Sequence, residues 1–389
     1  MKAVYVHIPF CEVKCGYCDF FSIPRGWEDF ELQKEYTEAL IREIETRVGE
    51  RQGEPLRSIF FGGGTPSLLD PSLLEKIIGT LRKYFVWDEK TEFTLESNPK
   101  TVSLEKLKNF RSLGVNRLSI GVQSFQENFL KKLGRIHSGE EAIQTVRDAR
   151  EAGFENINVD LIFSLPDQSL EDSQKDLRQA VSLETEHISA YSLTIEPNTA
   201  FATLHRQGKL VLPTDDESLQ FFQKTRRFLE GSGFRPYEIS NFARKGRECV
   251  HNQNYWNYGE YWGFGTAAAS FVKNGSILRH AQDVRPNVFG QRSTNTRNLK
   301  KYLEGEWSDF SEEIEISKAM GEYGMLTLRM PEGVRGDHFQ TEFGVSFDSV
   351  YAHELAQGIQ KGWLEMYEQG WRLTEEGVLF ADEVAMLFL

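Results

Sequence analysis

Short apolar runs rich in β-branched and aromatic residues alternate with segments of helical period through the first half of this chain. The six apolar runs are residues 3–8, 58–61, 92–95, 117–120, 156–161 and 187–191. The helical segments that accompany them are residues 29–48, 71–84, 104–113, 139–152, 170–181 and 216–231. Alternation of this kind is typical of βαβ units, which build a parallel sheet. Because a closed barrel needs eight units, six units predict an α/β fold based on a partial (β/α)6 TIM-like barrel.

The pattern changes after residue 199. We expect a short strand near residues 235–238 and a loop over residues 259–265, which are rich in glycine and aromatic residues. From about residue 300 the chain is expected to be helical and to end in a helix pair and a β-hairpin, which resembles a winged helix. The expected helices of the pair are residues 338–346 and 350–361, and the hairpin covers residues 363–374.

A chain of 389 residues is too long for one small domain. We predict a partial barrel over residues 1–235, a connecting segment over 236–300 and a mainly helical, winged-helix-like C-terminal domain over 301–389. Winged helices often bind DNA. Here the formal net charge is −13, and no Lys/Arg cluster lies on the helix that would read DNA, so we expect a packing or lid domain and no nucleic-acid partner.

The composition is that of an ordinary globular protein, with 40% hydrophobic and 26% charged residues. No apolar run approaches the roughly 20 residues that cross a bilayer. No targeting segment is recognisable at the start of the chain. We therefore expect a cytoplasmic protein without a membrane span.

Polar and glycine-rich residues follow the predicted strands at their carboxyl ends. Three cysteines come after the first strand and a glycine run after the second, while Glu96, Gln123 and Asp160 lie at the ends of the third, fourth and fifth. In barrels of this kind the residues that handle ligands lie on loops at the carboxyl ends of the strands. The sequence therefore predicts one large site at the top of the barrel.

Three of the four cysteines, Cys11, Cys15 and Cys18, fall within eight residues. Three thiols cannot pair off among themselves, and without a secretory leader a reducing compartment is expected, so this spacing favours metal binding over disulfides. A closed zinc site would need a fourth ligand, whereas three thiolates can hold an iron–sulfur cluster with one iron left open. A zinc site completed by a distant ligand, or plain structural thiols, stay open as alternatives on the spacing alone.

The C-x3-C-x2-C spacing, with Tyr17 before the last cysteine, resembles the signature of the radical S-adenosylmethionine (SAM) superfamily. This resemblance implies that Cys11, Cys15 and Cys18 hold a [4Fe-4S] cluster whose open iron binds SAM. Residues 62–66, Gly-Gly-Gly-Thr-Pro, resemble the GGxTP motif that holds the amino group of SAM. Residues 7–11, 62–66, 121–124 and 133–137 together are similar to the HemN/HemW subgroup of that superfamily, which contains oxygen-independent coproporphyrinogen III dehydrogenases and haem chaperones.

The subgroup resemblance also implies roles for single residues. Tyr5, Gly63 and Glu96 would contact the SAM on the cluster. A second SAM site, described for the dehydrogenase, would be lined at Tyr17, Gly64, Thr65, Gln123, Arg135 and Asp160. Taken alone, without the resemblance, Gln123, Arg135 and Asp160 would be interpreted as ordinary solvated surface residues. No residue is assigned as catalytic.

Two departures favour the haem chaperones over the dehydrogenases. The dehydrogenases carry a further cysteine two residues after the third cluster ligand, where this chain has Phe20, and an N-terminal extension, whereas His7 lies almost at the start here. Oxidative decarboxylation of coproporphyrinogen III, and a radical SAM reaction on another substrate, are the alternatives. Whether SAM is cleaved stays open.

Residues 251–256 match the HNxxYW motif associated with haem binding in the chaperones. The resemblance implies that His251, Tyr255 and Trp256 contact haem as cargo, with Cys249 as another candidate iron ligand. The alternative is a histidine and two aromatic side chains packed under the barrel mouth. The expected partners are recipient haemoproteins and an electron donor such as a flavodoxin or ferredoxin.

Overall fold

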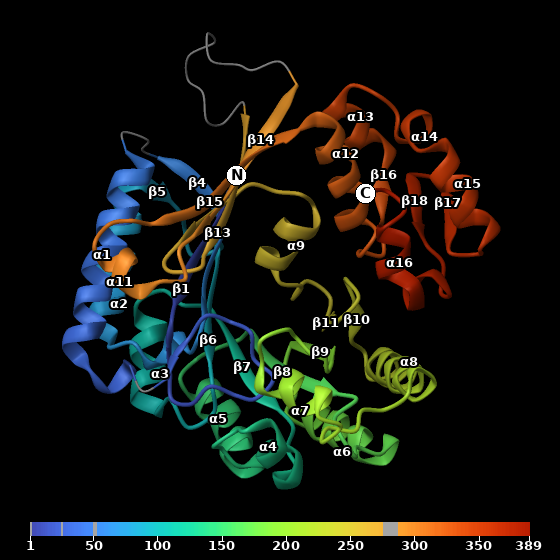
Figure 1. The fold of residues 1–389 in the computed structure, drawn as a ribbon. Helices are drawn as coiled ribbons and strands as arrows, with labels where there is room; N and C mark the ends of the chain where they lie inside the picture. Colours follow the sequence, from blue (N-terminus) through green and yellow to red (C-terminus); the bar gives the residue numbers. More distant parts are fainter. Residues whose placement is uncertain (1, 25, 50–52, 275–286) are drawn as a thin grey trace.

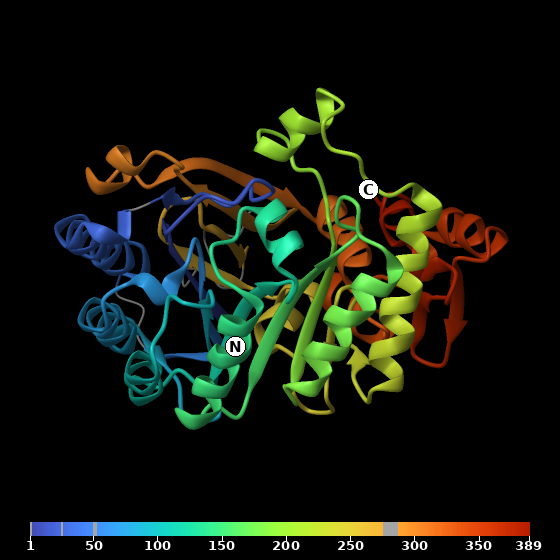
Figure 2. The same cartoon turned by 90° about the horizontal axis from the view of Figure 1, so that it is seen from below.

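The computed structural model describes residues 2–24, 26–49, 53–274 and 287–389. Its largest element is a sheet in which six parallel strands follow one another in chain order, as Figures 1 and 2 show. These strands are β1 (Lys2–Ile8), β4 (Glu54–Gly63), β6 (Glu92–Ser97), β7 (Arg117–Gln123), β8 (Ile157–Phe163) and β9 (His187–Ser192). The sheet curves without closing, so the predicted partial barrel is confirmed.

Helices cover the outer side of this curved sheet (Figure 2). The main ones are α1 (Phe30–Val48), α2 (Pro71–Tyr84), α3 (Leu104–Ser112), α5 (Gly139–Glu151), α6 (Leu170–Ser182) and α8 (Asp215–Gly231), with the shorter α4 (Glu127–Leu133) and α7 (Ala200–Arg206) between them. Their starts are encoded locally. Ser138, Ser169 and Thr214 form capping boxes with the acidic residues three positions later. The six main helices agree with the helical segments predicted from the sequence, whereas α4 and α7 were not predicted.

The two faces of the parallel strands differ in polarity. On β1 the outward side chains Val4, Val6 and Ile8 are buried in the apolar core with the helices. The inward side chains Tyr5 and His7 line a cavity instead. Strand side chains alternate between faces, so one strand can serve both the core and a site. The polar inner face marks the barrel interior as a ligand site rather than as packed core.

The sheet continues beyond the six predicted strands. On one side, β12 (Tyr261–Phe264) pairs in parallel with β1, and three antiparallel strands follow, which are β13 (Ala269–Lys273), β14 (Val288–Asn295) and β15 (Ser308–Glu315). On the other side lie β11 (Asn241–Ala243) and β10 (Arg235–Pro236), the latter within the short strand predicted there.

Two sequence predictions are therefore wrong. Residues 259–265 are not only a loop, because they contain β12, and residues 308–315 are a strand rather than part of a helical region. The strand β12 was missed because it contains glycine, which weakens the sequence signal of a strand. Glycine is required there, since a Cβ at Gly263 would lie 1.9 Å from the Ala269 carbonyl oxygen. The second strand forms through pairing with β14, which sequence periodicity does not report.

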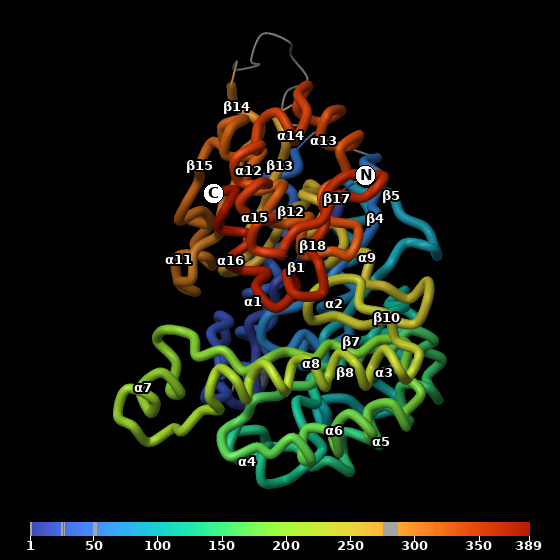
Figure 3. The backbone as a smooth tube through the Cα atoms, turned by 90° about the vertical axis from the view of Figure 1, so that its right-hand side faces the viewer, coloured from blue at the N-terminus to red at the C-terminus, as the bar shows by residue number. Residues whose placement is uncertain are grey.

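The C-terminal part has the predicted helix pair and hairpin, and it lies beside the barrel in Figure 1 and faces the viewer in Figure 3. Its elements are α12 (Ile316–Thr327), β16 (Val334–Arg335), α13 (Gly336–Phe343), α14 (Phe347–Val350), α15 (Ala352–Gln360), β17 (Leu364–Tyr367), β18 (Gly370–Leu373) and α16 (Ala381–Ala385). The short helix α11 (Leu299–Leu303) comes before them in the chain and packs against α1 instead. The strands form a small sheet in the order β16-β18-β17. This arrangement is winged-helix-like, as expected.

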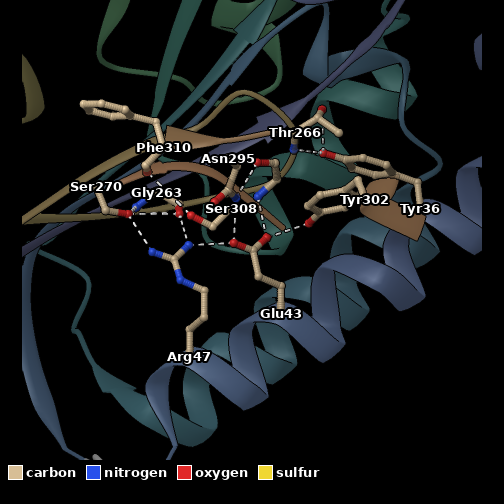
Figure 4. A network of polar contacts seen from close by, with 11 residues as sticks. Tyr36, Glu43, Arg47, Gly263, Thr266, Ser270, Asn295, Tyr302, Ser308 and Phe310 are labelled. Carbon is tan, nitrogen blue, oxygen red and sulfur yellow. Dashed lines mark hydrogen bonds and ion pairs between the residues drawn. The ribbon is translucent and has the colours of Figure 1, made fainter. Parts of the chain in front are cut away.

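A buried polar network attaches α1 to the extended side of the sheet (Figure 4). The Glu43 carboxylate, 0% exposed, accepts hydrogen bonds from the Gly265 N–H at 2.8 Å, the Tyr302 hydroxyl at 2.6 Å and the Asn295 amide at 2.6 Å. The same carboxylate forms an ion pair with Arg47, whose Nη1 lies 2.6 Å from Glu43 Oε1. The network holds the turn between β12 and β13 in place, and Ala267 of that turn lines the cavity at the barrel top.

Candidate functional site

A cavity of about 730 Å³ lies at the carboxyl ends of the parallel strands. It is lined by all three clustered cysteines, Cys11, Cys15 and Cys18. It is also lined by nine other residues singled out from the sequence, which are Tyr5, Tyr17, Gly63, Gly64, Thr65, Glu96, Gln123, Arg135 and Asp160. Parallel strands present their carboxyl ends on one side, so residues far apart in the chain meet there.

The cysteine loop begins at the short strand β2 (Phe10–Cys11) and is closed by β3 (Ile23–Pro24). All three thiols are free and partly exposed. Cys11 Sγ lies 3.4 Å from Thr65 Oγ1, and Cys15 Sγ accepts a hydrogen bond from Arg135 Nη1 at 3.6 Å. In the ranges that the structure describes, no three His, Cys, Asp or Glu side chains are already arranged as metal ligands. Three accessible thiols facing one cavity nevertheless fit a cluster by donor type, because thiolates are the usual ligands of iron–sulfur clusters.

The glycine run at the end of β4 lies against the end of β1. Gly63 has φ +116°, and a Cβ there would come within 2.6 Å of the His7 ring. At Gly64 a Cβ would lie 2.6 Å from the Phe10 carbonyl oxygen. Only glycine allows this approach, which brings the backbone of residues 62–66 to the cavity wall. There the Gly63 N–H donates to Glu96 Oε2 at 3.1 Å.

Two half-buried carboxyl groups, Glu96 and Asp160, face the cavity. Burial raises the pKa of Glu96 to about 8, with a further contribution from the charge of Asp160. Burial also raises the pKa of Asp160, although that carboxylate accepts hydrogen bonds from Asn158 at 2.7 Å and Ser119 at 3.3 Å. A cationic group placed beside Glu96 would favour its ionised form. Such a ligand would therefore lower the pKa of Glu96 toward its ordinary value.

The raised pKa of Glu96 predicts a pH effect on the metal-free protein. Between pH 4.5, the ordinary pKa of this group, and about 8, the folded chain keeps a proton that the unfolded chain has released. Stability should therefore fall as the pH rises through this window. We expect Glu96→Gln to remove this component, so the difference in melting temperature between wild type and variant should change from about pH 5 to about pH 9. A difference in melting temperature between the two proteins that stays the same at every pH would contradict this assignment.

Sequence reasoning missed several polar residues of the cavity. Arg117 is 2% exposed, and its Nη1 lies 3.5 Å from Thr94 Oγ1. Asn98 accepts a hydrogen bond from Arg135 Nη2 at 2.6 Å and donates to Thr65 Oγ1 at 2.8 Å. A signal for Arg117 was available: it alternates with Ser119, Gly121 and Gln123 along β7, and all four line the cavity.

The HNxxYW residues form α9 (Val250–Trp256), a short helix that contacts both β4 and α12. The N-terminus of this helix is fixed by Glu92 of β6, a residue not singled out from the sequence. Its carboxylate accepts the Val250 N–H at 2.9 Å and the His251 N–H at 3.0 Å. The same carboxylate accepts the thiol of Cys249, which is 0% exposed. The thiol of Cys249 is therefore engaged inside the protein rather than directed into a cavity.

His251 is 1% exposed and both of its ring nitrogens have partners. Nδ1 lies 2.8 Å from Ser58 Oγ and Nε2 lies 2.8 Å from Tyr255 Oη. Burial lowers the pKa of His251 to about 3, so the imidazole is neutral. Unlike the residues predicted around the cysteines, His251 does not line the cysteine-lined cavity.

Tyr255 and Trp256 line a second cavity, of about 540 Å³. Its walls come mainly from β1, from α9, from β12 to β14 and from α12. Among the lining residues are Tyr5, Tyr255, Trp256, Tyr258, Tyr261, Phe271, Arg292, Glu322, Met325 and Leu326. Tyr5 lines both cavities. Apart from His251, which lines neither, the structure thus divides the predicted site residues between two neighbouring cavities that share one tyrosine.

Comparison with known proteins gives matches along the whole chain. Residues 5–180 match the family model of the radical SAM superfamily, and residues 319–380 match that of the HemN C-terminal domain. The chain is 36% identical to the haem chaperone HemW of Escherichia coli (strain K12) over 387 residues, covering 100% of this chain and 98% of the relative. It is 35% identical to the haem chaperone HemW of Bacillus subtilis (strain 168), with coverage of 100% and 99%.

A mitochondrial relative and a solved structure extend these matches. The chain is 35% identical to radical S-adenosyl methionine domain-containing protein 1 of Danio rerio, covering 98% of this chain and 85% of that protein. The coproporphyrinogen III oxidase HemN of Escherichia coli has the same fold, with a TM-score of 0.83 at 24% identity, covering 100% of this chain and 90% of that one. Among the described residues, no helix has the length and apolar character that crossing a membrane requires.

Proposed function

We propose, from the premise that this chain belongs to the radical SAM superfamily and to its HemN/HemW subgroup, that it binds haem and delivers it to haemoproteins. The membership follows from the matched family model and from relatives at 36% and 35% identity over their full length. Those relatives are named haem chaperones, and we extend that activity to this protein. We also propose that it works in the reducing cytoplasm, in keeping with its free cysteines.

In this proposal Cys11, Cys15 and Cys18 hold a [4Fe-4S] cluster and the surrounding cavity holds SAM. When bound, the cluster supplies one-electron chemistry to SAM, with electrons from a donor such as a flavodoxin or ferredoxin. The backbone at Gly63 and the carboxyl group of Glu96, joined at 3.1 Å, would hold the amino end of SAM. Arg135, which contacts Cys15, would support the loop that carries the thiols.

The observation that carries the haem part is the separation of the two cavities. Tyr255 and Trp256 belong to a cavity of their own, rich in aromatic side chains, beside the one that holds the cysteines. A flat apolar ligand therefore has a place that does not compete with SAM. This arrangement suits a protein that carries a porphyrin better than one that must bring it to the cluster.

The alternative function is oxidative decarboxylation of coproporphyrinogen III. Phe20 stands where the dehydrogenases have a further cysteine, and its side chain is 69% exposed at the wall of the cysteine-lined cavity. A large apolar side chain at this place supplies no thiol to the reaction. We therefore rank this enzyme activity second.

One experiment separates the two functions. Anaerobically reconstituted protein is titrated with haem by absorbance and then mixed with an apo-haemoprotein such as apomyoglobin. A parallel sample receives coproporphyrinogen III, SAM and a reductant, and its products are separated by chromatography. We expect stoichiometric haem binding, transfer to the acceptor and no decarboxylated porphyrin. Formation of protoporphyrinogen would overturn the chaperone proposal.

A further inference from the structure

We propose that the second cavity is the haem site and that the thioether of Met325 on α12 is the protein ligand of the iron. This inference rests on the proposed function, because it assigns a place and an iron ligand to the haem that the chaperone would carry. It departs from the sequence-based interpretation, in which His251 of the HNxxYW motif and Cys249 are the candidate iron ligands.

The cavity suits a porphyrin in size and in surface. Its volume of about 540 Å³ falls within the roughly 300–1,000 Å³ of pockets that enclose cofactor-sized ligands. Its walls are mainly rings, with Tyr255 and Tyr261 in edge-to-face contact at 4.7 Å. Trp256, Tyr261, Met325 and Leu326 are half-buried, so the cavity combines apolar faces with access for a cargo that must leave.

The hydrogen bonds of His251 argue against it as the iron ligand. Its two ring nitrogens contact Ser58 and Tyr255, and the imidazole is packed against the ring of Phe60 at 5.0 Å. Binding iron would require breaking one of these contacts and turning a side chain that is 1% exposed. The structure gives His251 a different task, which is to orient Tyr255 in the cavity wall.

The tyrosines of the wall are poor ligands in this environment. A phenol binds ferric iron as phenolate, and burial raises the pKa of Tyr255, Tyr258 and Tyr261. The Tyr255 hydroxyl is engaged with His251, and that of Tyr258 donates to Glu322 at 2.7 Å. Among the described residues that line this cavity, Met325 carries the neutral sulfur donor, and thioethers are established axial ligands of haem iron.

A guanidinium on the same wall fits the porphyrin propionates. Arg292 of β14 is half-buried in the lining, where it contacts Glu322 and, at 2.9 Å, Glu312. Arginine binds carboxylates through two parallel hydrogen bonds, and a propionate can replace one protein carboxylate as its partner. The propionates would then face β14, while the iron lies on the side of α12.

The test uses the full-length, cluster-reconstituted protein and haem itself as the probe. Met325→Leu keeps the volume of the side chain and removes the sulfur, and we expect haem binding weakened by roughly tenfold or more with loss of the thioether–iron charge-transfer band. Leu326→Trp fills the cavity and should reduce binding further. Met366→Leu is the matched control, because Met366 is 71% exposed and lies outside the cavity lining. His251→Ala should retain the thioether band.

The outcomes separate this inference from the function on which it rests. Unchanged affinity and spectrum in both Met325→Leu and Leu326→Trp, with haem bound by the wild type, would overturn the assigned site and leave the chaperone function intact. Loss of the thioether band in His251→Ala but not in Met325→Leu would also overturn it. Wild-type protein that binds no haem would overturn the proposed function, and this inference with it.

Discussion

Serine at any one of Cys11, Cys15 and Cys18 is expected to abolish the iron–sulfur cluster. The three thiols line one cavity and are all free. In a cluster held by only three thiolates, removing one thiol leaves a second iron without a protein ligand. Iron and acid-labile sulfide should fall from about four of each per chain to below about one after anaerobic reconstitution. The visible absorbance of the cluster should disappear with them, whereas the fold, measured by circular dichroism, should persist.

Cys249→Ser provides the matched control for these variants. Cys249 is buried beside Glu92 and does not line the cysteine-lined cavity, so this variant should reconstitute like the wild type. Full iron content in any single variant of the cluster cysteines would show that a different residue completes the site. Zinc in place of iron in freshly purified anaerobic wild type would favour the zinc alternative.

Replacing Glu43 with alanine is expected to destabilise the protein by about 3–5 kcal/mol, the cost of removing one partner from a buried ion pair. The carboxylate is fully buried, and its loss leaves the Tyr302 hydroxyl and the Gly265 N–H without this acceptor and the Asn295 amide with only the Gly265 carbonyl (Figure 4). Arg47 loses its ion-pair partner as well. Urea unfolding followed by tryptophan fluorescence measures the effect as a lower midpoint.

Glu45→Ala is the control for this prediction, since Glu45 lies on the same helix two residues away. Its carboxylate pairs with Lys83 at 3.2 Å, and the two side chains are 41% and 61% exposed. Such surface pairs contribute about 0–1 kcal/mol, so the control should unfold close to the wild type. Similar midpoints for Glu43→Ala and Glu45→Ala would mean that the network does not hold α1 to the sheet.

Much of the barrel could be predicted because its signals are local. Alternating runs marked six strands, and capping residues such as Ser138 and Ser169 start helices through bonds to residues three positions away. The strands at 261–264 and 308–315 were missed, because each forms through pairing with another strand, β1 for the first and β14 for the second. Strand propensity depends on such neighbours more than helix propensity does.

The cysteine-lined site could also be predicted from the sequence, but the second cavity could not. Residues at the carboxyl ends of parallel strands had to meet on one side, so Glu96, Gln123 and Asp160 line one cavity with the cysteines. The division into two cavities was not foreseen. Nothing in the order of His251, Tyr255 and Trp256 shows that the histidine packs inward while the other two face a separate space.

By itself, the sequence determined the parallel α/β architecture, the cysteine spacing that suits a cluster and the glycines that let residues 62–66 approach β1. These properties depend on helical and strand period, turn chemistry and the absence of a Cβ, which neighbouring residues decide. Only the tertiary structure decided that Glu92 holds α9, that Glu43 meets Asn295, 252 residues away, and that Met325 and Tyr255 line the same cavity. Those contacts depend on how complete elements pack, because burial selects partners by shape and charge rather than by their distance along the chain.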